Sequence, residues 1–215
     1  MGRDRESCQR MPPIVRKGAG RSAFESSSIC ARIWVSVAPT HQRFVTKVND
    51  STIRPAYSDW SRHDAALRDV VAGLSAEDLA RRPGPERWPL WASIGHLACQ
   101  RVFWLCDFAG APGAETTRFT NATADCPGDD DLEHVLTASE LVDALDATFR
   151  IVEWCLDHWT LGSLEDVIRH PEWDGSWVKS RGSVIQRVFA HDISHISELN
   201  EALATGGLAR IDLWA

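Results

Sequence analysis

Two histidines, His191 and His195, stand four residues apart in a stretch with helical periodicity, residues 187–199. Four residues of a helix turn through about 400°, so the two imidazoles should lie one turn apart on the same face. That arrangement suits two ligands of one transition-metal ion, and Glu198 follows on nearly the same face. Such a pair also arises by chance, with one histidine in the core and the other in solvent. A metal site therefore requires a third ligand from elsewhere in the chain.

A third histidine, His96, lies in the apolar segment 88–105. Pro89 suits the first turn of a helix, and residues such as Ile94 and Leu97 belong to an apolar repeat at intervals of three and four. The segment is apolar on nearly every side, which is typical of a helix at the centre of a protein. A lone histidine on such a helix is more often a satisfied core residue than a ligand, so both roles stay open at this point.

The elements that would hold these histidines are four helices of roughly 17–25 residues with long connections, which predicts an all-α four-helix bundle. Ser75 is expected to cap a short additional helix, and Gly206 and Gly207 should end the last one. A turn signal at residues 174–175 favours a short hairpin before the last helix. Bundles build metal sites from inward-facing side chains of several helices, so His96 could meet the other two histidines. The long helices are expected at 51–74, at 88–105, from 137 or 139 to 159, and from 180 or 183 to 204.

Residues 109–131 form a long connection that is rich in Gly, Pro, Thr and Asp. Its three consecutive acidic residues, 129–131, lack the ligand spacing of a calcium loop and are expected to be solvated. Connections of this length in compact domains often act as lids.

Composition places the chain among soluble globular proteins. It has 215 residues, 25% charged and 44% apolar, which is enough for one domain with a sizeable core. The net charge of −7 does not favour a nucleic-acid partner. The sequence has no run of about 18 apolar residues and no evident signal peptide, so no membrane partner is expected. The six cysteines include no Cys-x-x-Cys pair, and Cys99 and Cys155 are expected to be buried thiols in a reducing cytoplasm.

The first 44 residues differ from the remainder. They carry eight Lys/Arg and three Asp/Glu, a balance of +5, which leaves −12 for the rest of the chain. Their Arg-, Ser-, Pro- and Gly-rich composition without periodicity predicts a disordered basic tail. The alternative is a mis-annotated start, with Val45 or Val48 as the initiating residue. The folded domain is expected at residues 52–215.

The chain resembles the DinB-like (damage-inducible protein B) superfamily of four-helix bundles, which includes metal-dependent thiol S-transferases and hydrolase-like proteins. The resemblance rests on Trp88 with residues 94–97, on residues 191–199, and on the ending 207–214. It implies that His96, His191 and His195 bind one divalent metal ion, with zinc or nickel expected, and it suggests a role in stress response. No catalytic residue is assigned by it.

Three neutral imidazoles would leave an open position on the ion for water or a thiol, both of which lose a proton more easily there. The resemblance favours transfer of a low-molecular-weight thiol co-substrate to a small electrophile. Glu198 or Asp192 could orient the imidazoles. Asp192, however, projects about 100° away from His191 and is more simply expected at the surface. The substrate is expected to be a small molecule, and the protein could form a homodimer.

Three other functions stay open. A metal-dependent hydrolase would use water at the same open position. A zincin-type protease would use Asp192 in the place of the usual glutamate base, although aspartate is one methylene shorter and the third ligand lies far upstream. A non-catalytic bundle could bind a small apolar molecule in a cavity lined by some of the ten tryptophans.

Removing residues 1–44 should leave the stability of the domain unchanged, because their composition does not support packing against the bundle. A chain that starts at Val45 should show the same melting temperature as the full chain in a thermal scan. A decrease of many degrees in the shortened chain would show that the segment packs on the bundle.

Overall fold

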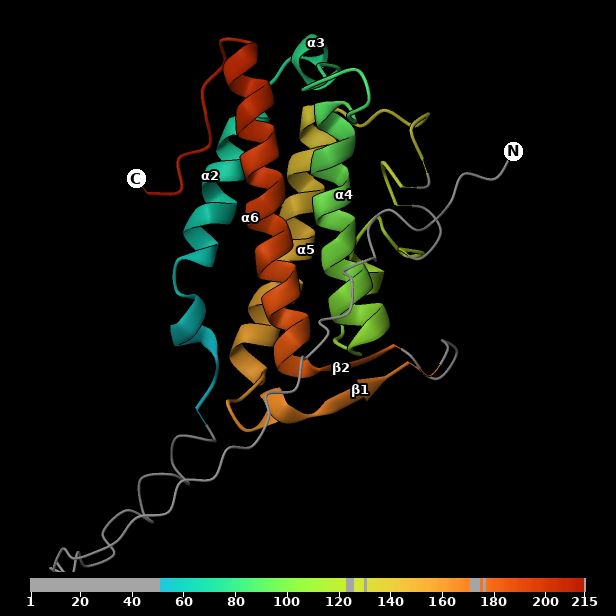
Figure 1. Cartoon of the computed structure of the whole chain (residues 1–215), viewed down its shortest axis with the longest axis vertical. Helices are drawn as coiled ribbons and strands as arrows, with labels where there is room; N and C mark the ends of the chain where they lie inside the picture. Colours follow the sequence, from blue (N-terminus) through green and yellow to red (C-terminus); the bar gives the residue numbers. More distant parts are fainter. Residues whose placement is uncertain (1–50, 123–125, 130, 171–174, 176, 215) are drawn as a thin grey trace, which may run out of the picture. The chain divides into compact units, whose positions relative to one another are not determined.

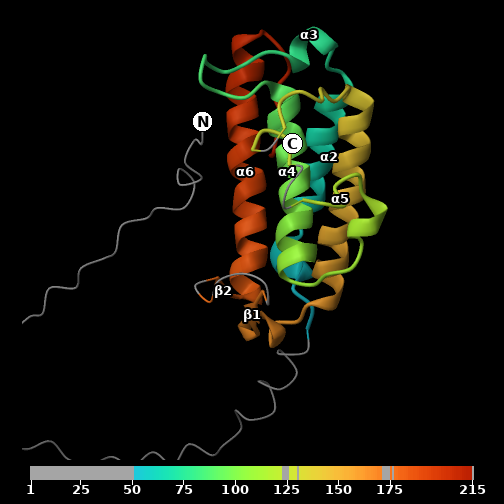
Figure 2. The ribbon, with the colours of Figure 1, turned by 90° about the vertical axis from the view of Figure 1, so that its right-hand side faces the viewer.

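The computed structural model describes residues 51–122, 126–129, 131–170, 175 and 177–214. The expectation for residues 1–44 lies outside this part of the chain. Four main helices run side by side in the described part and form the expected all-α bundle, as both ribbon views show (Figures 1 and 2). They are α2 (Trp60–Ala72), α4 (Leu90–Val102), α5 (Ala138–His158) and α6 (Arg181–Thr205). A short helix, α3 (Ala76–Leu79), precedes α4.

Local capping interactions fix several helix ends where the sequence predicted them. The Thr137 side chain accepts a hydrogen bond from the backbone N–H of Glu140, whose carboxylate accepts one from the Thr137 N–H, so α5 begins with a capping box. Ser75 begins α3 with the same motif, and the Ser180 side chain caps α6. Gly206 ends α6. These ends depend on residues three positions apart, which is why they were predictable.

The first long helix is shorter than predicted. It was expected to begin near Ser51, but α2 begins at Trp60 and has 13 residues. A helix begun at Ser51 would need a hydrogen bond from residue 55 to the Ser51 carbonyl, and Pro55 has no N–H to donate. That carbonyl instead accepts a hydrogen bond from the Leu161 N–H at 3.0 Å. The chain enters α2 through a 3-10 turn at residues 54–57.

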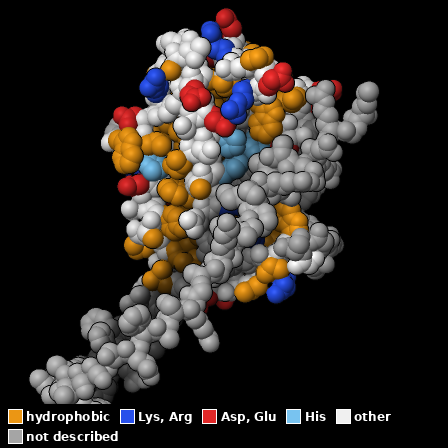
Figure 3. Space-filling model, viewed as in Figure 1, with side chains coloured by type: hydrophobic (Ala, Val, Ile, Leu, Met, Phe, Trp, Pro, Cys, Tyr) orange, Lys and Arg blue, Asp and Glu red, His pale blue; other side chains and the backbone are white. Residues whose placement is uncertain are grey.

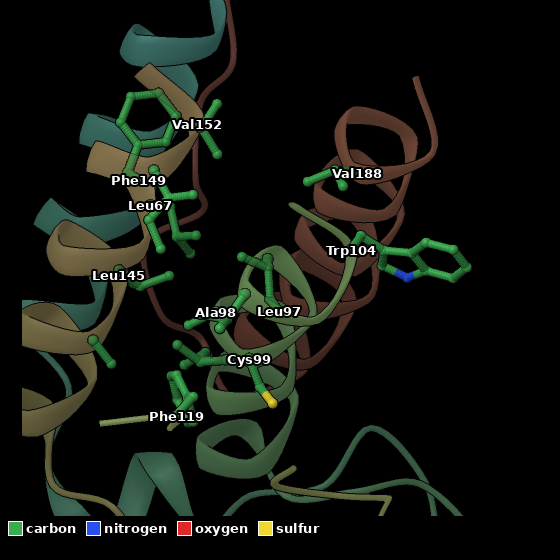
Figure 4. Close-up of a cluster of buried hydrophobic side chains, with 14 of the residues drawn as sticks. Leu67, Leu97, Ala98, Cys99, Trp104, Phe119, Leu145, Phe149, Val152 and Val188 are labelled. Carbon is green, nitrogen blue, oxygen red and sulfur yellow. The ribbon is translucent and has the colours of Figure 1, made fainter. Parts of the chain in front are cut away.

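Helix α4 is at the centre of the core, as its apolar sequence predicted. Each of its residues except Gln100 is buried. Figure 4 shows side chains of α4 facing those of α5, including Leu97 on the α4 side and Leu145 on the α5 side. Cys99 and Cys155 are buried thiols, as expected. A π-helix, residues 103–108, continues α4.

The predicted hairpin before the last helix is also present. Strands β1 (Val167–Arg169) and β2 (Val178–Ser180) pair antiparallel, with Ile168 opposite Lys179. Strand β2 leads directly into α6. Within the described residues, no helix combines the length and apolar character needed to cross a bilayer.

One buried guanidinium connects all four main helices. Arg101 of α4 occupies a position of the apolar repeat and is only 1% exposed, although its side chain is charged. It donates hydrogen bonds to Asp64 of α2 at 2.8 Å, to Asp192 of α6 at 2.7 Å and to the Leu145 carbonyl of α5 at 3.3 Å. Burial lowers the pKa of Arg101, but the charges of Asp192 and Asp64 outweigh that effect and raise it overall, so the guanidinium stays charged.

The expectation that Asp192 lies at the surface is wrong. Its side chain is buried, at 1% exposure, and accepts hydrogen bonds from Arg101 and from the Trp60 indole N–H at 2.8 Å. It does point away from His191, as the helical geometry required. Its direction leads into the core rather than to solvent, because Arg101 is there to neutralise it.

Replacing Arg101 with methionine should destabilise the fold strongly, because Asp64 and Asp192 would be left as buried charges without their partner. We expect the free energy of unfolding to fall by about 3–5 kcal/mol, measured by urea denaturation. Arg118→Met is the matched control, since Arg118 forms an exposed pair with Glu140 at 3.5 Å; its loss should cost at most about 1 kcal/mol. Equal effects of the two substitutions would contradict a central role for Arg101.

Candidate metal site

The three histidines come from two packed helices. His96 lies in the first half of α4, and His191 and His195 lie on successive turns of α6. The ion pair between Asp192 and Arg101 fixes the rotation of α6 about its axis at this level. Successive side chains of a helix point in directions about 100° apart around its axis. With Asp192 directed into the core, His191 therefore lies at the side of α6 that faces the first half of α4.

The structure brings the three imidazoles together through the same nitrogen of each ring. The Nε2 atom of His191 lies 3.2 Å from Nε2 of His96 and 3.1 Å from Nε2 of His195. Ligand atoms bound at about 2.0–2.1 Å to a tetrahedral ion are about 3.3 Å apart. Both measured separations are close to this value, and one ligand nitrogen of each ring lies within 4.8 Å of the other two, so the three could hold one ion.

The other ring nitrogen of His96 faces groups that can accept a proton. His96 Nδ1 lies 3.5 Å from the Cys126 sulfur and 3.4 Å from a carboxylate oxygen of Asp129. Burial lowers the pKa of His96, but Cys126, Asp129 and the Pro127 carbonyl outweigh it and raise the pKa overall. These surroundings favour a proton on Nδ1, which leaves the Nε2 lone pair directed at the other two histidines.

Cys126 and Asp129 were not identified from the sequence. The acidic run was expected to be solvated loop, and no motif linked Cys126 to a histidine thirty positions earlier. A hydrogen bond involving the Cys99 thiol is the main cause that lowers the pKa of Cys126 to about 6, and His96 adds to it against the effect of burial. His96, Cys126 and Asp129 could themselves hold an ion. Asp129 is half exposed, and its distance fits a weak contact that orients His96.

Glu198 occupies a matching position beside His195. One of its carboxylate oxygens lies 3.2 Å from His195 Nδ1, on the opposite side of the ring from the Nε2 cluster. The other oxygen lies 3.5 Å from the Arg87 guanidinium. The His195 Nδ1 atom is buried and lacks an aligned hydrogen-bond acceptor, so this contact is electrostatic rather than a well-formed hydrogen bond. Glu198 thus lies where it can orient a ligand, whereas ligation would require its side chain to move.

Asp192 takes no part in the cluster. Its carboxylate is occupied by Arg101 and Trp60 in the core, so it cannot accept a proton from a water molecule at the histidines. The zincin-type arrangement considered from the sequence requires that role of it. The geometry therefore argues against a protease of that kind.

The cluster is buried on the α4 side and more open on the α6 side. His96 is 6% exposed and packs against the Trp88 indole, with 4.9 Å between ring centroids. His191 and His195 are half-buried. Figure 3 shows histidine side chains at the surface, among hydrophobic and charged ones. A small molecule could thus approach the cluster from the α6 side.

Both histidines of α6 are held in the neutral form. Burial, together with the neighbouring imidazoles, lowers the pKa of His191 to about 2. Burial and His96 lower the pKa of His195 to about 4. Neutral imidazoles carry the lone pairs that a metal ion needs. If His96 and His195 carry their protons on Nδ1, three nitrogens with at most one proton converge, and a cation would relieve the repulsion between their lone pairs.

The metal-free protein should lose stability as the pH falls from about 6.5 towards 4. Unfolded histidines take up protons near pH 6.5, whereas folded His195 stays neutral until about pH 4. The unfolded chain then binds more protons, so the free energy of unfolding falls with pH, by an amount on the order of 1–3 kcal/mol. Urea denaturation across this range measures it. A His191→Gln, His195→Gln double variant should lose this share of the pH dependence, and an unchanged slope would contradict the assignment.

Comparison with known proteins agrees with this fold. The sequence pattern that describes the DinB superfamily matches residues 59–199 of this chain. Among solved structures, the chain is similar to a DinB-like protein from Bacillus cereus ATCC 10987, with 14% sequence identity and a TM-score of 0.53, over 75% of this chain and 96% of that one. At that identity the likeness is one of fold. A search of curated proteins found no match. Because the family model spans most of the bundle and the fold agrees, this chain belongs to the DinB superfamily.

Proposed function

We propose that His96, His191 and His195 hold one divalent metal ion, zinc or nickel, and that the protein transfers a low-molecular-weight thiol to a small electrophile. The observation that carries the metal proposal is the convergence of the three rings, with Nε2 of His191 3.1–3.2 Å from Nε2 of the other two. The lowered pKa values of His191 and His195 support it, because the two rings are ready to bind without first losing a proton.

A divalent ion held by three imidazoles would supply an open coordination position at which a thiol or a water molecule loses its proton near neutral pH. The residues of the chain provide the conditions for that chemistry. His96 is buried and oriented through Nδ1 by Cys126 and Asp129. Glu198 faces Nδ1 of His195. The histidines of α6 are partly exposed, with 14% of the His195 side chain accessible, so the cluster has contact with solvent on that side.

The charge of the ligand set and the resemblance noted in the sequence support the proposal of thiol transfer. Three neutral ligands leave the full charge of the ion to stabilise an incoming thiolate. The new bond forms between the thiol sulfur and an electrophilic carbon, while a leaving group departs from that carbon and the thiol proton passes to solvent or to the leaving group. The reaction consumes no oxidant or reductant. No side chain of the described residues is assigned to proton transfer.

Two alternatives are a hydrolase at the same site and a non-catalytic bundle that binds a small apolar molecule in a cavity lined by tryptophans. A hydrolase would use water at the open position, and assays with esters and amides would detect it. A non-catalytic bundle would bind a small molecule without turnover. Metal content, followed by thiol-conjugation and hydrolysis assays on the loaded protein, distinguishes the three.

The purified protein should contain one tightly bound ion per chain, and alanine at any of the three histidines should remove it. Glu198→Ala should weaken binding only about 10–100-fold, because Glu198 contacts the ring nitrogen that faces away from the ion. Elemental analysis and competition with a chelator measure both effects. Metal loss from Glu198→Ala as complete as that from His195→Ala would show that Glu198 is itself a ligand. Full metal content in all three alanine variants would contradict the site.

A cobalt-substituted protein tests the open position. Titration with a small thiol should change the visible absorption of cobalt, because sulfur enters the coordination sphere. Absence of any change at saturating thiol would show a closed site and would contradict the transferase proposal. A change with thiol, together with hydrolysis but no conjugation, would favour the hydrolase.

A further inference from the structure

Arg187 is an exposed cation one helical turn before His191 on α6. The spacing of four residues places the two side chains on the same face, about 6 Å apart along the axis. The guanidinium therefore lies on the side of α6 that also carries His191.

An aromatic surface holds Arg187 in place. Its guanidinium carbon lies 4.4 Å from the centre of the Trp104 ring. Trp104 stacks on Trp177 with 6.1 Å between centroids, and its indole N–H donates a hydrogen bond to Gln100 at 3.1 Å. Gln100 lies one turn after His96, and Trp104 lies one turn after Gln100, so the aromatic surface lies further along the same helices from the cluster. Trp104 also belongs to a π-helix, residues 103–108, and such widened turns are frequent at functional sites.

The charge of Arg187 is not neutralised by a carboxylate of the described residues. In that part of the chain its guanidinium contacts the Trp104 ring. Other arginines near the cluster are paired: Arg101 with two aspartates, and Arg87 with Glu198. A guanidinium held over an aromatic ring still has N–H groups at its edge that can bind a carboxylate. Arg187 thus offers a cation without a carboxylate partner among the described residues, on the α6 side of the cluster.

We infer that Arg187 binds a carboxylate group of the thiol co-substrate, so that the thiol class used by this protein is an anionic one. The inference rests on the proposed function, because it takes the sulfur to bind at the histidines. Four residues of α6 separate Arg187 from His191, an axial rise of about 6 Å. A short acidic thiol spans it with its sulfur at the cluster and its carboxylate at Arg187.

The test compares two thiols of equal length, 3-mercaptopropionate and 3-mercaptopropionamide, on the cobalt-substituted full chain. Dissociation constants are obtained from the cobalt absorption for the unaltered protein, for Arg187→Gln, and for Arg187→Lys. Arg150→Gln is the matched control, because Arg150 is an exposed arginine of α5 that pairs with Asp146. Cobalt content and far-ultraviolet circular dichroism establish that each variant is folded and loaded.

The unaltered protein should prefer the acid over the amide by about 10- to 100-fold. Arg187→Gln should reduce that ratio to within about threefold by weakening the acid and leaving the amide unchanged. Arg187→Lys should retain part of the preference, and Arg150→Gln all of it. Direct binding of the carboxylate to cobalt would raise the affinity for the acid equally in every variant. A change in the preference for the acid from one variant to another therefore reports the contribution of Arg187 alone.

A preference that is equal in the unaltered protein and in Arg187→Gln would overturn the inference and leave the proposed function standing. An amide that binds as tightly as the acid to the unaltered protein would overturn it as well. If neither thiol alters the cobalt spectrum, the proposed function fails and the inference fails with it.

Discussion

The buried ion pairs of Arg101 are the constraint on which the arrangement of the bundle depends. A guanidinium at 1% exposure is tolerated only where its charge is neutralised and its N–H groups find acceptors. Asp64, Asp192 and the Leu145 carbonyl meet both requirements from three other helices. Apolar packing alone permits a helix to rotate or slide at modest cost, whereas a displaced α6 would leave Asp192 buried and unpaired. The polar contact therefore specifies one orientation of α6 among the many that apolar packing would permit.

The candidate metal site inherits its geometry from that contact. Asp192 and His191 are neighbours in the chain, so fixing the aspartate in the core also fixes the direction of the histidine. Arg101 lies five residues after His96 on α4, and it thereby ties α4 and α6 together close to the site. The Nε2 separations of 3.1–3.2 Å depend on this alignment, since loss of one helical turn of register would move a ring by about 5.4 Å. Structural and functional positions are thus interleaved on the same two helices.

The sequence allowed a large part of this structure to be predicted, because much of it depends on short-range patterns. The spacing of His191 and His195, the cap at Thr137 and the apolar character of α4 each involve residues a few positions apart. The convergence of His96 with the pair followed from the expectation of a bundle. The start of α2 differs from the prediction because Pro55 has no backbone N–H to donate to the Ser51 carbonyl. The spacing of apolar residues does not reveal this constraint.

Other features depend on partners that no local pattern reveals. Arg101 appeared as one member of an apolar repeat, and its partners lie 37 and 91 residues away in sequence. Asp192 was placed at the surface because a carboxylate is usually exposed when its partner is unknown. Cys126 and Asp129 belong to an irregular connection, where periodicity gives no direction for a side chain. Each of these residues takes its role from a tertiary contact.

The electrostatic surroundings of the cluster bear on the chemistry it can support. Arg101 is neutralised within the core, but Arg187 adds a positive charge on the solvent side, and both contribute to keeping His191 unprotonated. Further cations are therefore disfavoured beside a loaded site, while an incoming anion is favoured. A thiolate, and a carboxylate on the same molecule, fit these charges better than a neutral ester or amide does. Under the proposed function, the distribution of charge around three neutral ligands would thus favour an anionic thiol over a neutral one.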